Sequence, residues 1–335
     1  MDDAAFLQAI CADPTADGPR LVYADYLDEK GDPASAARAE FIRVQCAMAA
    51  AGPSDRVVAT LGEREGSLLQ LHWQEWLKPA CQALAEPTPV ATGRAITDRY
   101  ALNWCLLSPQ QAPAHWFTQG TRESSPYFHS GQFRRGFLSH VALVSKPHKS
   151  ASHVARLFER APVDGLTLVG HGGVEVGRTL RALPADRLRS LELVGCPTDA
   201  VVMIAGSDKL RCLQDLVVLG TVGADIGDEI GRSSAFPNLT SLTVHRCGLD
   251  ADGVVRLLAA PFAPRLERLE LTGCQMTGAV GAALARNFPA GNRLVYLALT
   301  EDSLDRETIR QLKSRFGETC AFTDGNREWP TRYFR

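Results

Sequence analysis

The chain has 335 residues, of which 45 % are hydrophobic and 22 % charged, and both values are ordinary for a globular protein. Its length suffices for a sizeable hydrophobic core. The formal net charge of −2 supplies no basic field of the kind that nucleic acid or an acidic membrane surface requires, so neither is expected as a partner.

The number and spacing of the cysteines indicate the redox state of the protein's compartment. The nine cysteines are an odd count, and no two of them form a Cys-x-x-Cys pair, which indicates a reducing environment and not a disulfide framework. The acidic N-terminal sequence lacks the basic region and apolar run of a secretory signal, and no uncharged apolar stretch of about 18 residues is present to span a bilayer. We therefore expect a cytoplasmic protein with no membrane partner.

Helical patterns dominate residues 1–85, which we interpret as a helical N-terminal lobe. Three short helices are expected within residues 1–50, separated by Asp13-Pro14 and by Gly31. Each has apolar residues at helical spacing on one face.

A fourth helix is expected from Asp55 to Ala85, where Pro79 limits it. Its predicted buried residues are Leu61, Leu68, Leu69, Leu71, Trp73, Trp76 and Leu77.

Residues 86–132 differ in composition, because they contain many prolines and aromatic residues and no period dominates. A disordered linker would be poor in aromatic residues. We therefore expect an ordered, irregular insertion that packs on the segment that follows it.

One phrase recurs seven times between residues 133 and 323: an apolar residue, two free positions, Leu or Val, one free position, and Leu or Val. Successive copies begin 25, 25, 25, 26, 27 and 28 residues apart, and three copies have cysteine eight residues after their start. The period predicts an α/β fold, a leucine-rich-repeat solenoid of about seven strand-helix repeats with a parallel sheet on its concave face. The copies begin at Leu138, Val163, Leu188, Leu213, Leu239, Leu266 and Leu294, and the cysteines are Cys196, Cys247 and Cys274.

A closing helix is expected from Asp305 to Phe316, followed by a short strand from Thr319 to Phe322. The tail, residues 324–335, is rich in aromatic residues and arginine, which are enriched at binding hot spots. It either binds a partner or covers the open end of the solenoid. The tail residues proposed for binding are Trp329, Arg332, Tyr333 and Phe334.

Residues 6–33 read FLQAICADPTADGPRLVYADYLDEKGDP and are followed by RAEFIRVQ. Together they resemble the repeat-companion domain, a short helical module of bacterial proteins that usually precedes leucine-rich repeats, and we assign it to residues 1–50. The phrase FRRGFLSHVALV, residues 133–144, resembles the way such proteins enter their repeats. Tyr26 stands where Trp is expected, and residues 34–37 are an insertion. The resemblance implies an architecture and no catalytic residues. The matching positions are Arg20, Leu21, Tyr23, Ala24, Asp25, Leu27, Gly31, Asp32, Glu40, Phe41, Ile42 and Gln45.

Residues between and after the core leucines alternate onto the concave face. Four apolar residues form a stripe there, and a stripe of that kind needs covering, either by the insertion of residues 86–132 or by a partner. Mixed charges and a ring on the later repeats suit a specific protein contact. The apolar stripe is Val144, Val169, Val194 and Leu219, and the polar candidates are Glu192, Asp215, His245, Arg246, Arg268, Glu270 and Tyr296.

No catalytic, cofactor-binding or metal-ligating set is predicted. Five histidines lie between His115 and His153, but their spacings match no zinc pattern. We therefore interpret the chain as a non-enzymatic scaffold that binds another protein, as a subunit or adaptor of a bacterial complex. The alternative is an enzyme or metal-binding protein with a site in residues 86–153 that uses Cys105, His115 or His129.

Overall fold

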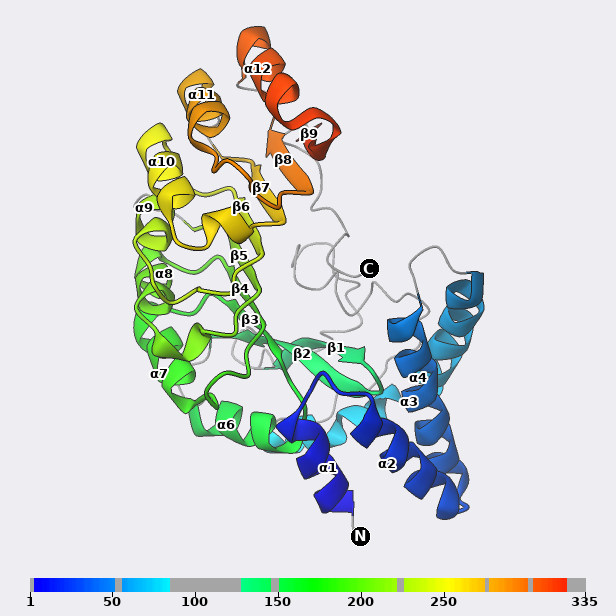
Figure 1. Ribbon diagram of the computed structural model, residues 1–335. Helices are drawn as coiled ribbons and strands as arrows, with labels where there is room; N and C mark the ends of the chain where they lie inside the picture. The colour runs from blue at the N-terminus through cyan, green and yellow to red at the C-terminus, as the bar shows by residue number, and fades with distance from the viewer. Residues whose placement is uncertain are drawn as a thin grey trace, which may run out of the picture. The chain divides into compact units, whose positions relative to one another are not determined.

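The computed structural model describes residues 3–51, 56–84, 128–145, 151–221, 226–274, 277–300 and 304–323. They form a mixed α/β structure with a helical N-terminal part (Figure 1), which confirms the predicted class. The chain divides into two compact units. The described residues up to Asp164 form the first unit, and those from Gly165 onwards form the second.

The first unit begins with four helices, whose starts follow local signals. Asp32 has extended backbone, and its side chain accepts a hydrogen bond from the Ser35 amide at 2.9 Å, while Pro33 occupies the first helical position. These residues fix where the third helix begins. The helices are α1 (Asp3–Ala12), α2 (Gly18–Glu29), α3 (Pro33–Ala50) and α4 (Arg56–Ala83).

Helix α4 corrects two details of the sequence interpretation. It continues through Pro79, which was expected to limit it, and ends at Ala83. Pro79 is exposed, on the side of the helix opposite the buried Leu77. Leu71 was expected to be buried but is 76 % exposed, because its position two residues before the buried Trp73 places it on the outer face.

A β-hairpin follows in the first unit. Strands β1 (Phe128–Arg134) and β2 (Phe137–Val144) pair in antiparallel fashion, with Arg134 opposite Phe137. The two turn residues, Arg135 and Gly136, have φ of 49° and 84°, as a type I′ turn requires. The irregular segment predicted for residues 86–132 therefore ends in a strand, while residues 85–127 lie outside the described residues. Helix α6 (Ala151–Arg160) completes this unit.

The second unit contains parallel strands that follow one another in chain order. Adjacent strands pair without offset, so that Leu166 lies beside Leu191 and Leu191 beside Leu216. These strands are β3 (Gly165–Val169), β4 (Ser190–Val194), β5 (Asp215–Leu219), β6 (Ser241–His245), β7 (Arg268–Thr272), β8 (Tyr296–Thr300) and β9 (Cys320–Thr323). Strands β3–β8 coincide with the last six copies of the predicted repeat, whereas the first copy, which begins at Leu138, lies on the hairpin strand β2 of the first unit.

Helices alternate with these strands and lie together on one side of them (Figure 1). Two rows of Leu and Val on β3–β8 are 0 % exposed, and burial of each such side chain contributes roughly 1.5–3 kcal/mol. We call them the leucine rows: Leu166, Leu191, Leu216, Leu242, Leu269 and Leu297, with Leu168, Leu193, Val218, Val244, Leu271 and Leu299. The helices are α7 (Gly173–Ala182), α8 (Thr198–Ala205), α9 (Ile226–Gly231), α10 (Ala251–Ala259), α11 (Gly278–Asn287) and α12 (Arg306–Phe316), and the short 3-10 turns are η2 (Asp208–Leu210), η3 (Ala263–Arg265) and η4 (Gly317–Thr319).

Each of the strands β3–β7 is followed by a residue with positive φ. Four of these residues are glycines, and the fifth is Arg246 with φ of 51°. The amides of Gly170, Gly195, Gly220 and Arg246 donate to the last carbonyl of the next strand at 2.8–2.9 Å. The same kind of left-handed turn therefore follows each of these strands. The residue with positive φ after β7 is Gly273.

Buried cysteines follow three of the strands. The thiol of Cys196 donates to the Leu168 carbonyl at 3.2 Å, and that of Cys274 donates to the Val244 carbonyl at 3.6 Å. Burial raises the pKa of Cys196 to about 11 and that of Cys274 to about 12, and it also raises the pKa of Cys247. These thiols pair with backbone groups of the preceding repeat.

Replacing Gly220 with Ala is expected to lower the free energy of unfolding by about 1 kcal/mol, because φ is 64° there. No described atom lies within 4 Å of an added Cβ, so the cost is conformational. Gly206→Ala is the matched control, since Gly206 has φ of −93° and an added methyl would meet Val202 O at 3.6 Å. Urea unfolding measures both variants. Equal destabilisation of the two would contradict the left-handed requirement.

Candidate functional site

The side of β3–β8 that faces away from the leucine rows carries three rows of side chains, and we call it the strand face. Alternation along each strand places Thr167 there, between the buried Leu166 and Leu168. The strand pairing sets corresponding residues side by side. The central row is Thr167, Glu192, Val217, Thr243, Glu270 and Ala298; the first row is Gly165, Ser190, Asp215, Ser241, Arg268 and Tyr296; the third is Val169, Val194, Leu219, His245, Thr272 and Thr300.

The central row is largely buried. Thr167 and Thr243 are 0 % exposed, and Val217 and Glu270 are 1 % exposed. The sequence did not indicate this, because a strand pattern tells which face a residue occupies and not what covers that face. Apart from the half-buried Glu192, the accessible groups of the strand face therefore lie in its first and third rows.

Glu192 is a carboxyl group of the strand face whose pKa is strongly shifted. Thr167 Oγ1 donates a hydrogen bond to Glu192 Oε2 at 2.8 Å. Burial raises the pKa of Glu192 to about 7, and the negative charge of Asp215 on the neighbouring strand acts in the same direction. Glu192 therefore changes charge near neutral pH. Thr167 is a polar neighbour that sequence reasoning did not select, although the 25-residue period places it directly beside Glu192.

Arg268 links two other predicted residues. Its Nη1 lies 3.6 Å from Glu270 Oε1, and its guanidinium lies 5.0 Å from the centre of the Tyr296 ring. Arg268 and Tyr296 are half-buried, whereas Glu270 is buried. A stacked guanidinium is held in one orientation, which suits recognition of a carboxylate.

The third row changes from apolar to polar along the unit. Val169 and Val194 are half-buried and Leu219 is 7 % exposed. His245 Nδ1 lies 2.8 Å from Thr272 Oγ1. Burial lowers the pKa of His245 to about 4, and the positive charge of Arg246 contributes, so the ring is neutral at pH 7. Of the two remaining predictions for this face, Arg246 is exposed and the side chain of Val144 lies outside the described residues.

Several predicted residues are not described. The tail residues Trp329, Arg332, Tyr333 and Phe334 and the alternative site residues Cys105 and His115 lie outside the described ranges, as does the side chain of His129. Within the described ranges, no three His, Cys, Asp or Glu side chains are grouped as a metal ion requires. Burial lowers the pKa of His140 to about 4, which makes it a neutral, packed side chain at pH 7.

Glu192→Gln is expected to change how stability depends on pH. The folded-state pKa of about 7 lies above the ordinary value of 4.5, so the proton stabilises the folded state below about pH 4.5 and this stabilisation is lost as the pH rises towards 7. The free energy of unfolding of the variant, relative to that of the unmodified chain, should therefore be roughly 1–3 kcal/mol higher at pH 8 than at pH 5. Urea unfolding at both pH values measures this.

The exposed Glu267, outside the strand face, provides the matched control. The free energy of unfolding of Glu267→Gln should differ from that of the unmodified chain by the same amount at both pH values. A Glu192→Gln difference that is equally independent of pH would show that this carboxyl is not protonated in the folded protein.

In the described part of the chain, no helix is both long enough and apolar enough to cross a membrane. No protein-family model matches the sequence, and no curated protein matches it either.

Proposed function

We propose that the chain is a non-enzymatic scaffold that binds another protein through the strand face, and that its second unit is a leucine-rich-repeat solenoid. The parallel strands in register, with a helix between consecutive strands and a period of 25–28 residues, support the solenoid. The resemblance of residues 1–50 to the repeat-companion domain supports a bacterial, cytoplasmic setting as a subunit or adaptor of a complex.

The observation that carries this proposal is the first row of the strand face. Asp215, Arg268 and Tyr296 are all half-buried, so part of each remains accessible to a partner. Asp215 on β5 and Arg268 on β7 are two strands apart, which corresponds to about 10 Å. A partner that places a basic group near Asp215 and an acidic group near Arg268 fits this spacing.

Apolar surface beside these charges supplies affinity. Val169 and Val194 are half-buried neighbours in the third row, and the buried Leu219 continues this apolar run onto β5. Charged groups at an interface contribute selectivity and orientation, whereas burial of apolar surface contributes most of the favourable free energy. The β3–β5 end of the strand face is therefore assigned to affinity, and the β7–β8 end to selectivity.

Two single substitutions test the surface. Asp215→Lys and Arg268→Glu should each reduce capture of a specific protein from a lysate of the source organism at least ten-fold, because each places a like charge opposite the partner's group. Glu270 is left unchanged because reversal of a buried charge would unfold the protein, and Glu192 is left unchanged because its pKa is raised to about 7. Quantitative mass spectrometry of the captured proteins is the measurement.

Arg178→Glu on helix α7 is the matched control, because Arg178 is exposed and lies on a helix. It should capture the same protein as the unmodified chain, and circular dichroism should show all variants folded. If the Asp215 and Arg268 variants capture that protein in unchanged amounts, the strand face is not the binding surface.

A further inference from the structure

The phrase Phe-Arg-Arg-Gly-Phe, residues 133–137, forms the end of the β1–β2 hairpin and has no part in the strand face. Helices α2–α4 of the same unit contact it through side chains and backbone alike. Leu84 ends the described helical segment and Phe128 begins the hairpin, so the contact joins parts of the chain that are distant in sequence.

Gln45 on α3 binds the backbone of the turn. Its Oε1 accepts a hydrogen bond from the Gly136 amide at 2.6 Å, and its Nε2 donates to the Phe133 carbonyl at 3.2 Å. The second donor position of the amide is used as well, because Nε2 also donates to Glu65 Oε1 at 2.7 Å. Gln45 is 5 % exposed, so these groups are paired away from water.

Gly136 is required at its position for two reasons. Its φ of 84° favours glycine, and a Cβ added there would stand 2.7 Å from the Ile42 Cα, which is backbone of helix α3 and cannot move aside. The turn therefore approaches the helix as closely as only glycine permits.

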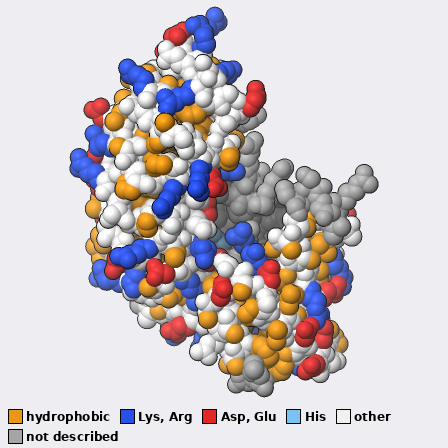
Figure 2. Space-filling view, in the orientation of Figure 1, with side chains coloured by type: hydrophobic (Ala, Val, Ile, Leu, Met, Phe, Trp, Pro, Cys, Tyr) orange, Lys and Arg blue, Asp and Glu red, His pale blue; other side chains and the backbone are white. Residues whose placement is uncertain are grey.

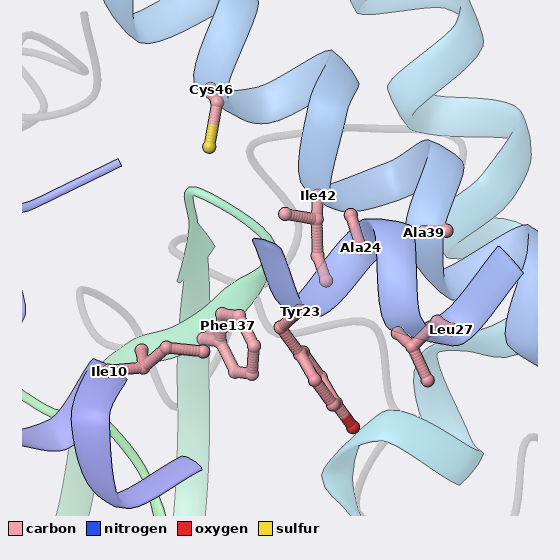
Figure 3. Packing of buried hydrophobic residues seen from close by; sticks show 8 residues of the cluster. All are labelled: Ile10, Tyr23, Ala24, Leu27, Ala39, Ile42, Cys46 and Phe137. Carbon is pink, nitrogen blue, oxygen red and sulfur yellow. The ribbon is translucent and has the colours of Figure 1, made fainter. Parts of the chain in front are cut away.

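Phe137 completes the core of the N-terminal helices. Figure 3 shows its ring beside Ile10 and Tyr23, and it is 4 % exposed. Two arginines flank the ring, with the guanidinium of Arg20 at 5.6 Å and that of Arg38 at 5.0 Å from its centre. The rest of this cluster is Ala24, Leu27, Ala39, Ile42 and Cys46.

Phe133 is recognised in a similar way on the other side of the turn. Its ring meets Phe41 edge to face at 5.8 Å and lies 6.4 Å from Trp76 of α4. The guanidinium of Arg38 lies 4.8 Å from the Trp76 ring centre and 5.9 Å from that of Phe133. Arg38 thus packs between both phenylalanines of the phrase, and aromatic faces surround its charge.

Arg135 is held by charge. Its Nε lies 2.7 Å from Asp17 Oδ1. Arg20 fixes the segment that leads to Asp17, because it donates to the Ala16 and Pro14 carbonyls at 2.7 and 2.9 Å. Of the five residues, only the exposed Arg134 has none of these contacts.

We propose that helices α1–α4 form a receptor for a β-hairpin turn of the pattern Phe-x-Arg-Gly-Phe, and that the hairpin of this same chain occupies it. A different group of the helical part contacts each specified position. Arg38 and Trp76 contact the first Phe, and Asp17 pairs with Arg. Gln45 binds the backbone at Gly, and the helical core packs around the second Phe. This recognition is independent of the strand face. A hairpin with the same pattern, supplied as a separate peptide, is the expected ligand when the chain's own turn is disabled.

Hydrogen exchange on the full chain is the first experiment. Gly136→Ala should increase the exchange rates of buried α2 and α3 amides at least ten-fold, because the clash with Ile42 disengages the turn. Gly66→Ala on α4 is the control, since no described atom lies within 4 Å of its added Cβ. Unchanged α2 and α3 exchange in Gly136→Ala would overturn the proposal.

Peptide binding is the second experiment. A fluorescent peptide of residues 128–145 should bind the full-length Gly136→Ala chain, and the same peptide with Gly136→Ala should bind at least ten-fold more weakly. Equal binding of the two peptides, or no binding of either, would overturn the proposal.

A charge exchange keeps the test decisive if the Gly136 variant does not fold. Asp17→Arg and Arg135→Asp should each lower the melting temperature of the full chain, and the double variant should recover at least half of the loss. If the two losses in melting temperature simply add in the double variant, Asp17 does not interact with Arg135.

Discussion

Burial of the leucine rows against helices α7–α12 is the constraint on which the second unit depends. Side chains alternate between the two faces of a strand, so a slip of one residue would move Glu192 among the leucines and expose Leu191 and Leu193. The cost of burying this carboxyl and of exposing two leucines therefore fixes the pairing of β4 with its neighbours. The strand face is thus determined by the residues on the opposite side of the sheet.

Both units use polar groups whose surroundings are set by apolar packing. On the strand face, burial shifts the titration of Glu192 to near neutral pH and keeps His245 neutral. In the first unit, apolar packing brings the Gln45 amide against the hairpin turn, where its hydrogen bonds have no competition from water. Burial lowers the pKa of Arg38 to about 10 even though aromatic rings surround it. In both units, therefore, burial disfavours the charged form of a polar side chain.

The repeat phrase predicted the strands well because its three apolar positions are a local signal that recurs at a regular spacing. It also placed Glu192, Asp215 and Arg268 on one face, since alternation is a local property too. Burial of the central row was not predictable, because it depends on atoms far from any single strand. The pairing of Gln45 with Gly136 was missed for the same reason: resemblance marked both segments, but no periodicity joins residues that lie so far apart in the chain.

The buried cysteines that follow β4, β6 and β7 can report local opening of the second unit. A thiol whose pKa is raised by burial and whose hydrogen goes to a carbonyl is a poor nucleophile, so it reacts with an alkylating reagent only when its own repeat opens. In a linear array, each repeat touches only its neighbours. The order in which Cys196, Cys247 and Cys274 become labelled would therefore record the direction in which the array comes apart.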